Sequence, residues 1–205
     1  MSKISLDHMD SFHYDILKEL GNIGAGNATT ALSQMLNLKI DMKVPRVDLL
    51  EFKNLTDIVG GEENIVVGIL LTLEGEIDGM MMFMLEKASA HRLVNRLLNY
   101  NLDMDAELDE MALSALNEIG NIITGAYLSS LSKLTGILIT SSIPYMAIDM
   151  AGAILSVPAI EFGKVGDKAL VIDTEFGDDS LSVDGYFILI PSLDSYDIIL
   201  SSLGL

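Results

Sequence analysis

The chain has 205 residues, which is long enough to bury a substantial core, and it contains no cysteine. The missing thiols exclude a disulfide framework, a cysteine nucleophile and a cysteine zinc site, and they are compatible with a reducing compartment, so we expect a cytoplasmic protein. With 30 acidic and 12 basic residues the formal net charge is -18, which disfavours nucleic acid or an anionic membrane as a partner. Apolar runs such as Met80–Leu85 are far shorter than the roughly 20 residues of a membrane-spanning helix.

The first predicted helix runs from about residue 12 to residue 36 and has two different faces. Asp15, Glu19 and Asn22 follow one another at i, i+4 and i+7, so they share a narrow sector of the helix surface. The apolar residues that recur at helical spacing are expected to face the core: Ile16, Leu20, Ile23, Ala28 and Ala31. The helix therefore presents a carboxylate and a carboxamide side by side to solvent.

Three glycines interrupt this helix, at Gly21, Gly24 and Gly26. Each costs about 1 kcal/mol relative to alanine inside a helix, so we predict that they serve the close approach of another backbone. Gly26 and Ser33 also continue the polar face, where their small size would let another helix or protein surface lie close.

The next elements follow in chain order. Residues 38–44 alternate apolar and polar side chains up to a proline, which predicts a half-buried strand. Residues 53–64 read as a turn-rich connection. Two apolar runs at 65–74 and 78–85 flank a short turn that contains glycine, which predicts an antiparallel hairpin. A helix is expected at 89–98, followed by an acidic connector.

The second half of the chain repeats the first. A helix is predicted from about residue 110 to residue 134, and on it Ser114, Glu118 and Asn121 repeat the spacing of the first polar face. A strand is expected at 137–143, and the asparagine precedes the proline that ends the strand by 23 positions in both copies. The apolar residues at helical spacing in the second helix are Ala115, Ile119, Ile122 and Ala126.

Similarities outside the two helices favour an internal duplication. Two pairs of segments match between the halves: 77–84 with 183–190, and 91–98 with 197–205. We therefore expect one domain over residues 1–205, made of half-repeats at about 1–100 and 101–205. The predicted fold class is α+β, with two pseudo-symmetric α-β-x-β-β-α halves whose antiparallel sheet is covered by helices.

The segment 146–155 has a less obvious counterpart in the first half. It is apolar on nearly all sides apart from Asp149. Two interpretations remain open for it: a buried turn of helix, or an exposed surface for interaction with another protein.

The repeated polar pattern resembles the signature of the CheC/CheX/FliY family of chemotaxis phosphatases. The pattern is Asp or Ser, three residues, Glu, two residues, Asn, 22 residues and Pro, and it occurs twice here without departure. The similarity extends over nearly the whole chain. Two copies are typical of the CheC-like branch, whereas CheX-like chains carry one copy and FliY-like chains add a flagellar switch domain that is absent here.

This resemblance implies hydrolysis of the aspartyl-phosphate of the response regulator CheY. In the family the Asn amide orients the attacking water, and the Glu contacts the active-site lysine of the regulator. The residues that the resemblance implies for catalysis are Glu19, Asn22, Glu118 and Asn121. Asp15 and Ser114 would be supporting contacts to the partner. The resemblance also implies a second partner, the receptor deamidase CheD, whose binding region would lie near Asp149.

Such chemistry asks for no metal ion held by this chain. A neutral carboxamide can position a water, and both Mg²⁺ and the lysine are expected on CheY. The three histidines, His8, His13 and His91, lack the spacing of a metal site, so none is predicted. We expect a monomer.

Other functions remain open at this point. A single exposed Glu-x-x-Asn is usually only a solvated helix face, and it is the repetition with the same spacing to proline that favours function here. The chain could also be a non-catalytic module that sequesters phosphorylated CheY or CheD, or a flagellar-switch adaptor. Release of phosphate from phosphorylated CheY would distinguish an enzyme from either binder.

Overall fold

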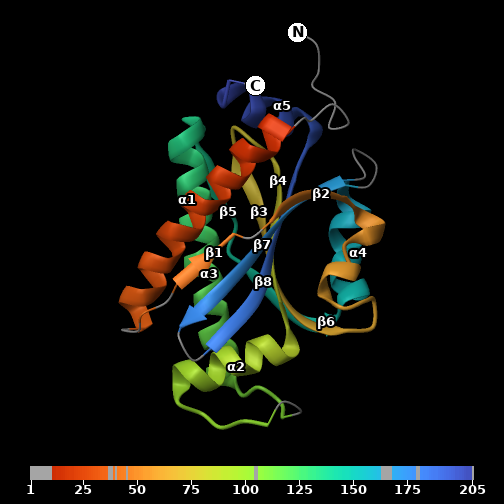
Figure 1. Ribbon diagram of the computed structural model, residues 1–205. Helices are drawn as coiled ribbons and strands as arrows, with labels where there is room; N and C mark the ends of the chain where they lie inside the picture. The colour runs from red at the N-terminus through yellow and green to blue at the C-terminus, as the bar shows by residue number, and fades with distance from the viewer. Residues whose placement is uncertain are drawn as a thin grey trace.

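A computed structural model describes residues 11–36, 39, 41–44, 46–103, 106–162, 168–178 and 181–204 (Figure 1). In chain order the elements are α1 (Ser11–Leu36), β1 (Asp41–Lys43), β2 (Val47–Glu51), the short 3-10 helices η2 (Phe52–Asn54) and η3 (Asp57–Val59), β3 (Ile65–Gly75), β4 (Gly79–Glu86), α2 (Lys87–Leu98), α3 (Glu110–Thr135), β5 (Ile139–Ser141), β6 (Tyr145–Met150), α4 (Ala151–Phe162), β7 (Lys168–Asp178), β8 (Leu181–Pro191) and α5 (Leu193–Ser202). Both predicted motif helices and the predicted hairpin are confirmed. His8, Pro45 and the side chains of His13 and Leu20 lie outside the described part.

Eight strands form one antiparallel sheet of order β1-β7-β8-β4-β3-β5. β2 pairs with β7 beside β1, and β6 pairs with β3 beside β5. The first two strands of each half therefore pair with the hairpin of the other half. The halves thus exchange their outer strands. When β1, β3 and β4 are matched with β5, β7 and β8, the order of equivalent strands is the same from either edge of the sheet.

The register at the centre of the sheet is consistent with a duplicated chain. β4 and β8 pair so that Met82 lies opposite Ile188. These two residues hold the same place in the matching segments 77–84 and 183–190. A two-fold axis between two antiparallel strands passes between equivalent residues, so this register fits a pseudo-two-fold relation. The boundary of the half-repeats near residue 100 stays a prediction.

Helices cover both faces of the sheet (Figure 1). α1, α2 and α3 lie on one face, and α4 lies on the other together with η2 and η3. In β4, Met81 and Phe83 belong to the core under α1 and α3, whereas Met82 and Met84 belong to the core under α4. Because both faces of the central strands are buried, the β4 sequence is apolar without alternation.

Glycines bring α1 close to α3. A Cβ at Gly24 would come within 2.8 Å of the Tyr127 ring, and a Cβ at Gly21 would lie 2.9 Å from its hydroxyl oxygen. The Tyr127 ring fills this space and stacks on Phe187 with ring centroids 4.9 Å apart. The predicted close approach of a backbone is wrong at Gly21 and Gly24, because the atoms nearest to an added Cβ there belong to side chains, chiefly that of Tyr127. At Gly26 it is also wrong, because nothing lies within 4 Å of an added Cβ.

The predicted apolar stripe of α1 is wrong in part. Ile16, Ile23 and Ala31 are only half-buried. The α1 residues that are buried are Leu17, Gly21, Gly24, Ala25, Ala28 and Leu32. Sequence patterns follow the large side chains, whereas the buried face of α1 includes Gly21 and Gly24, which face the side chain of Tyr127. The inward face is therefore rotated from the predicted one.

Residues 146–155 divide between the two interpretations: residues 151–155 form a buried first turn of α4, with Ala151, Ile154 and Leu155 in the core, whereas residues 146–150 do not. Met146 to Met150 belong to the edge strand β6, where Ile148, Asp149 and Met150 are exposed, and α4 begins at the buried Ala151. Strands β2, β6 and β7 were not predicted, and α4 was anticipated only as a buried turn within residues 146–155. Within the described ranges, no helix is both long and apolar enough to cross a membrane.

Candidate functional site

The first polar motif lies on the outer face of α1. Asp15, Glu19 and Asn22 are all exposed, as their spacing predicted. On the opposite side of the helix Leu17 and Ala28 are buried in the core, which fixes the rotation of α1 about its own axis. The Glu19 carboxylate and the Asn22 carboxamide consequently face solvent about one turn apart.

The second polar motif lies on the outer face of α3. Ser114, Glu118 and Asn121 are exposed in the same way. The start of this helix is defined by a side-chain cap, because the Asp109 carboxylate accepts a hydrogen bond of 2.8 Å from the Ala112 N–H. The cap places the first turn of α3, and with it the register of the motif.

The two motifs share one side of the sheet but lie toward opposite ends of it. The C-terminal halves of α1 and α3 contact each other, where Asn27 Nδ2 donates a hydrogen bond of 2.7 Å to Ser130 Oγ. Figure 1 shows that α1 starts near α5, whereas α3 starts at the other end of the molecule beside α2. Glu19 and Glu118 are therefore parts of two separate exposed sites.

On the outer face of each helix, the asparagine is followed by a glycine that leaves the backbone open to solvent. Gly26 lies about one turn after Asn22, and Gly125 lies about one turn after Asn121, and nothing lies within 4 Å of a Cβ added to either glycine. The Thr30 hydroxyl donates a hydrogen bond of 3.0 Å to the Gly26 carbonyl, so it turns back toward the helix. A partner surface could approach the backbone closely at these positions.

A large apolar side chain stands at the other end of each motif. Phe12 precedes Asp15 by three positions, Met111 precedes Ser114 by three positions, and each is 61% exposed. Their repetition at the same distance from the two motifs was a signal in the sequence, but these residues were not predicted to belong to the sites. They extend the row of exposed motif residues on each helix by about one helical turn. We call each row a strip: Asp15, Glu19 and Asn22 on α1, and Ser114, Glu118 and Asn121 on α3.

The motif side chains can act on water and on a cation. A carboxamide is neutral and both donates and accepts hydrogen bonds, whereas a carboxylate only accepts them. An Asn and a Glu one turn apart can thus hold a water molecule and an ammonium group at neighbouring points. In the part of the chain that the structure describes, no three His, Asp or Glu side chains are grouped so that they could hold a metal ion.

The structure separates Asp149 from both motifs. It lies on β6 opposite Val66 of β3, whose side chain belongs to the core under α4, so Asp149 is on the sheet face away from α1 and α3. Its Oδ1 accepts a hydrogen bond of 2.8 Å from the Met150 N–H. Asp149 is therefore part of a different surface from the Glu-Asn pairs.

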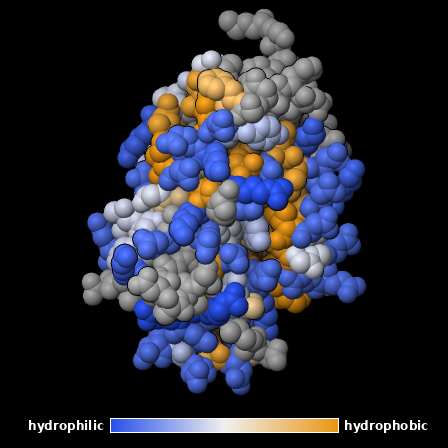
Figure 2. All heavy atoms as spheres, in the orientation of Figure 1, coloured by the Kyte–Doolittle hydropathy of each residue, from blue (hydrophilic) through white to orange (hydrophobic). Residues whose placement is uncertain are grey.

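Asp149 and α4 share one face of the sheet, and we call this the β6–α4 surface. Its exposed large apolar side chains are Val157 and Ile160 of α4. Ile65, Ile148 and Met150 are exposed too, but they alternate with Asp149 along the paired strands β3 and β6 and therefore point to the sheet face of α1 and α3. α4 is apolar on nearly all sides but buries only one of them, which is unusual for a surface helix. Figure 2 shows mainly polar surface on the visible face, with an apolar band where α4 packs beside the sheet.

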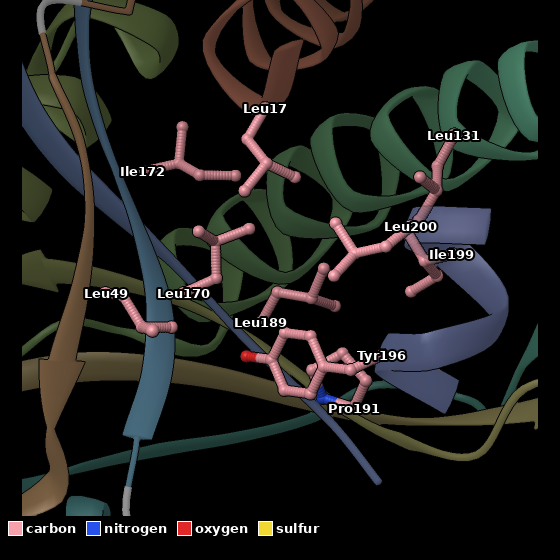
Figure 3. Close-up of a pocket in the computed structure, with 10 residues that line it drawn as sticks. All are labelled: Leu17, Leu49, Leu131, Leu170, Ile172, Leu189, Pro191, Tyr196, Ile199 and Leu200. Atoms are coloured by element: carbon pink, nitrogen blue, oxygen red, sulfur yellow. The ribbon is translucent and has the colours of Figure 1, made fainter. Parts of the chain in front are cut away.

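A small apolar pocket lies behind the first motif helix (Figure 3). Leu17 of α1, Leu131 of α3 and Ile199 of α5 line it together with strand residues. Tyr196 also lines it, and burial raises the pKa of this hydroxyl above its ordinary value. The pocket supports the inner side of α1 and lies on the opposite side of that helix from Glu19.

Two family models match the sequence. The CheC-like family matches residues 12–48, which contain the first motif, and the chemotaxis phosphatase CheX family matches residues 66–168, which contain the second. The CheY-P phosphatase CheC of Bacillus subtilis is 40% identical over 195 residues, which cover 93% of both chains. The putative CheY-P phosphatase CheC1 of Halobacterium salinarum is 20% identical over 91% of this chain and 94% of its own length.

Solved structures share the fold. FliY of Thermotoga maritima superposes with a TM-score of 0.75 at 25% identity, covering 96% of this chain and 98% of its own. A chain of the CheX–CheY–BeF3–Mg²⁺ complex from Borrelia burgdorferi gives a TM-score of 0.51 at 19% identity, covering 84% of this chain and 96% of its own. The antiparallel sheet covered by helices is thus an architecture that other chains of this kind also have.

Proposed function

The chain belongs to the CheC family of chemotaxis phosphatases, and on that premise we propose that it hydrolyses the aspartyl-phosphate of the response regulator CheY. The observation that carries the proposal is the pair of exposed motifs, Glu19 with Asn22 and Glu118 with Asn121, each presented by a long helix. The activity named for the B. subtilis relative supports the same reaction. A cytoplasmic location and a monomeric state belong to the same proposal.

The proposed role of the asparagine is to position water. Oδ1 of Asn22 or Asn121 accepts a hydrogen bond from a water molecule, whose oxygen then attacks the phosphorus in line with the bond to the regulator's aspartate. That P–O bond breaks and the aspartate leaves as a carboxylate. One proton of the water stays on the oxygen now bound to phosphorus, and the other goes to another oxygen of the inorganic phosphate. A neutral amide suits this reaction because its loose transition state needs alignment more than a strong base.

The proposed role of the glutamate is to dock the regulator. A carboxylate one turn before the asparagine can accept charged hydrogen bonds from a lysine ammonium of CheY. Asp15 and Ser114 would contact the regulator beside it. Mg²⁺ bound to CheY would neutralise phosphoryl charge, and this chain would contribute the water-positioning amide and the docking carboxylate.

Phosphate release from phosphorylated CheY tests the activity. We expect the N22A/N121A double variant to lose roughly a hundredfold in turnover, because a positioned polar group of this kind contributes on the order of 3 kcal/mol to transition-state stabilisation. Asn54→Ala is the matched control, since Asn54 is exposed on η2 and belongs to neither motif. Full turnover in the double variant would show that the asparagines do not position the water.

The same assay separates the enzyme from a binding module. A sequestering module or a switch adaptor would bind phosphorylated CheY and slow its spontaneous loss of phosphate, or leave it unchanged. An enzyme accelerates that loss at substoichiometric concentration. Acceleration by catalytic amounts of the chain is the result we expect.

A second function, docking of CheD, is proposed for the β6–α4 surface. Its support is that α4, on the same sheet face as Asp149, exposes the apolar side chains of Val157 and Ile160, because exposed apolar surface marks protein interaction sites. An acidic residue on the same face can orient a partner through a charged hydrogen bond. The location on the opposite sheet face would allow CheD and CheY to bind together.

Replacement of Asp149 by Lys tests this docking site. We expect weaker binding of CheD with unassisted phosphate release unchanged, because Asp149 lies on the other side of the sheet from both motifs. Binding can be followed by calorimetry and turnover by phosphate release. Equal loss of both would indicate damage to the fold instead of loss of a docking contact.

A further inference from the structure

Each proposed catalytic strip begins with an apolar residue that the water-positioning mechanism does not use. Phe12 precedes Asn22 by ten positions, and Met111 precedes Asn121 by ten positions. At 100° per residue, both fall in the same sector of their helices as the Glu and the Asn that follow. Each of the two sites therefore has the same order along the helix: a large apolar residue, an Asp or Ser, a Glu, an Asn and a Gly.

Phe12 and Met111 are exposed despite their size. Each has 61% of its surface open to solvent, on a helix face that is otherwise polar or occupied by glycine. The Tyr100 hydroxyl lies 3.4 Å from the Met111 sulfur and donates to it, which restrains that long side chain. An exposed apolar side chain that is held in place is suited to entering a hydrophobic recess on a partner.

We propose that Phe12 and Met111 are the apolar anchors by which each site docks its substrate protein, the phosphorylated regulator. This inference rests on the proposed phosphatase function, and the partner follows from continuity, because each anchor lies on the same strip as the residues that reach the phosphoryl group. Ten residues of helix span about 15 Å, so the anchor contacts the regulator away from its phosphorylated aspartate. The regulator must present an apolar recess at that distance.

The anchor role predicts an effect on binding and none on chemistry. A contact made equally in the bound complex and in the transition state changes KM and leaves kcat unaltered. Truncation of a central apolar side chain at an interface typically weakens association by about tenfold. Loss of a catalytic group would instead lower kcat.

The test uses variants in which a single site is active. In the N121A background, Phe12→Ala should raise KM for phosphorylated CheY about tenfold with kcat within twofold of the parent, and Phe12→Met should restore KM. In the N22A background, Met111→Ala should have the same effect, and Met111→Phe should restore KM. The rescues exchange the two residues that the chain itself uses at this position.

Leu138→Ala is the matched control. Leu138 is 64% exposed and follows α3 outside both strips, so its truncation should leave KM unchanged. Because both anchors are exposed, circular dichroism should show unaltered folding for every variant. A KM unchanged by Phe12→Ala and by Met111→Ala, or raised equally by Leu138→Ala, overturns the proposal.

A binding measurement separates this inference from the proposed reaction. The dissociation constant for CheY activated with beryllofluoride and Mg²⁺ needs no turnover, and the two anchor truncations together should raise it by about tenfold or more. Suppose that the wild type binds this CheY but releases no phosphate from phosphorylated CheY, and that the truncations weaken binding. The hydrolysis proposal is then wrong and the anchor proposal is supported. If the wild type hydrolyses phosphorylated CheY and the truncations leave binding unchanged, the anchor proposal is wrong and the hydrolysis proposal is supported.

Discussion

Tyr127 lies in the contact between the two motif helices. Its hydroxyl group is buried and has no hydrogen-bond partner among the described residues. The ring fills the space left by Gly21 and Gly24 and stacks on Phe187, so its apolar part packs well. A buried hydroxyl without a partner lowers stability because it has lost its hydrogen bonds to water. The ring thus stabilises the helix contact while its hydroxyl opposes it.

Tyr127→Phe should therefore stabilise the protein. Removing the unpaired hydroxyl should raise the free energy of unfolding by about 1 kcal/mol, and the midpoint of thermal unfolding by a few degrees. Urea and thermal denaturation followed by circular dichroism measure both. Tyr145→Phe, at an exposed position, is the control and should change little. A loss of stability in Tyr127→Phe would show that the hydroxyl does have a partner in solution.

The same hydroxyl predicts a dependence on alkaline pH. Burial raises the pKa of Tyr127 above its ordinary value of 10.0. The unfolded chain loses this proton near pH 10 while the folded protein keeps it, so stability falls as the pH rises above about 10 and up to the raised pKa. Denaturation from pH 8 to pH 11 should show a smaller fall for Tyr127→Phe than for the wild type. Some fall should remain, because burial also raises the pKa of Tyr196.

At the scale of elements, α1 contains two glycines with opposite surroundings only two positions apart. Gly24 faces the Tyr127 ring, whereas Gly26 faces open space. Gly24→Ala should lower the free energy of unfolding by about 1 to 3 kcal/mol through overpacking. Gly26→Ala should raise it by about 0.5 to 1 kcal/mol, because alanine favours the helix. Urea denaturation of the two variants measures both changes, and equal shifts of the same sign would contradict this packing.

The elements show what sequence reasoning could and could not predict. The motif side chains and the hairpin followed from helical and strand periodicity, because Asp15, Glu19 and Asn22 need only local geometry to share a face. The rotation of α1 did not follow, since Gly21 and Gly24 carry no hydrophobic signal and are buried only because Tyr127 reaches them from another element. β6 was missed for a related reason. Its apolar residues look like core, and pairing with β3 at the edge of the sheet is a long-range contact.

At the scale of the whole molecule, the two proposed sites should work independently. Each lies on its own helix, and the two helices start at opposite ends of the structure (Figure 1). N22A or N121A alone should therefore leave substantial turnover, on the order of half if the sites are equal, while the double variant loses roughly a hundredfold. Phosphate release from phosphorylated CheY by the single variants measures this. Abolition of all turnover by either single replacement would mean that the sites depend on each other.

The exchange of outer strands has a consequence for how such a chain could have arisen. If residues 1–100 were made alone, the β3–β4 hairpin would lack the strands that β5 and β6 provide, while β1 and β2 would have no hairpin to join. Two copies of that fragment could complete each other across the β4 edge, where the full chain places β8. If the chain arose by duplication, this topology would fit an ancestor that was an obligate homodimer. Fusion of two copies of its gene would have turned an assembly that depended on concentration into one that does not, and would have left each proposed site free to diverge from the other.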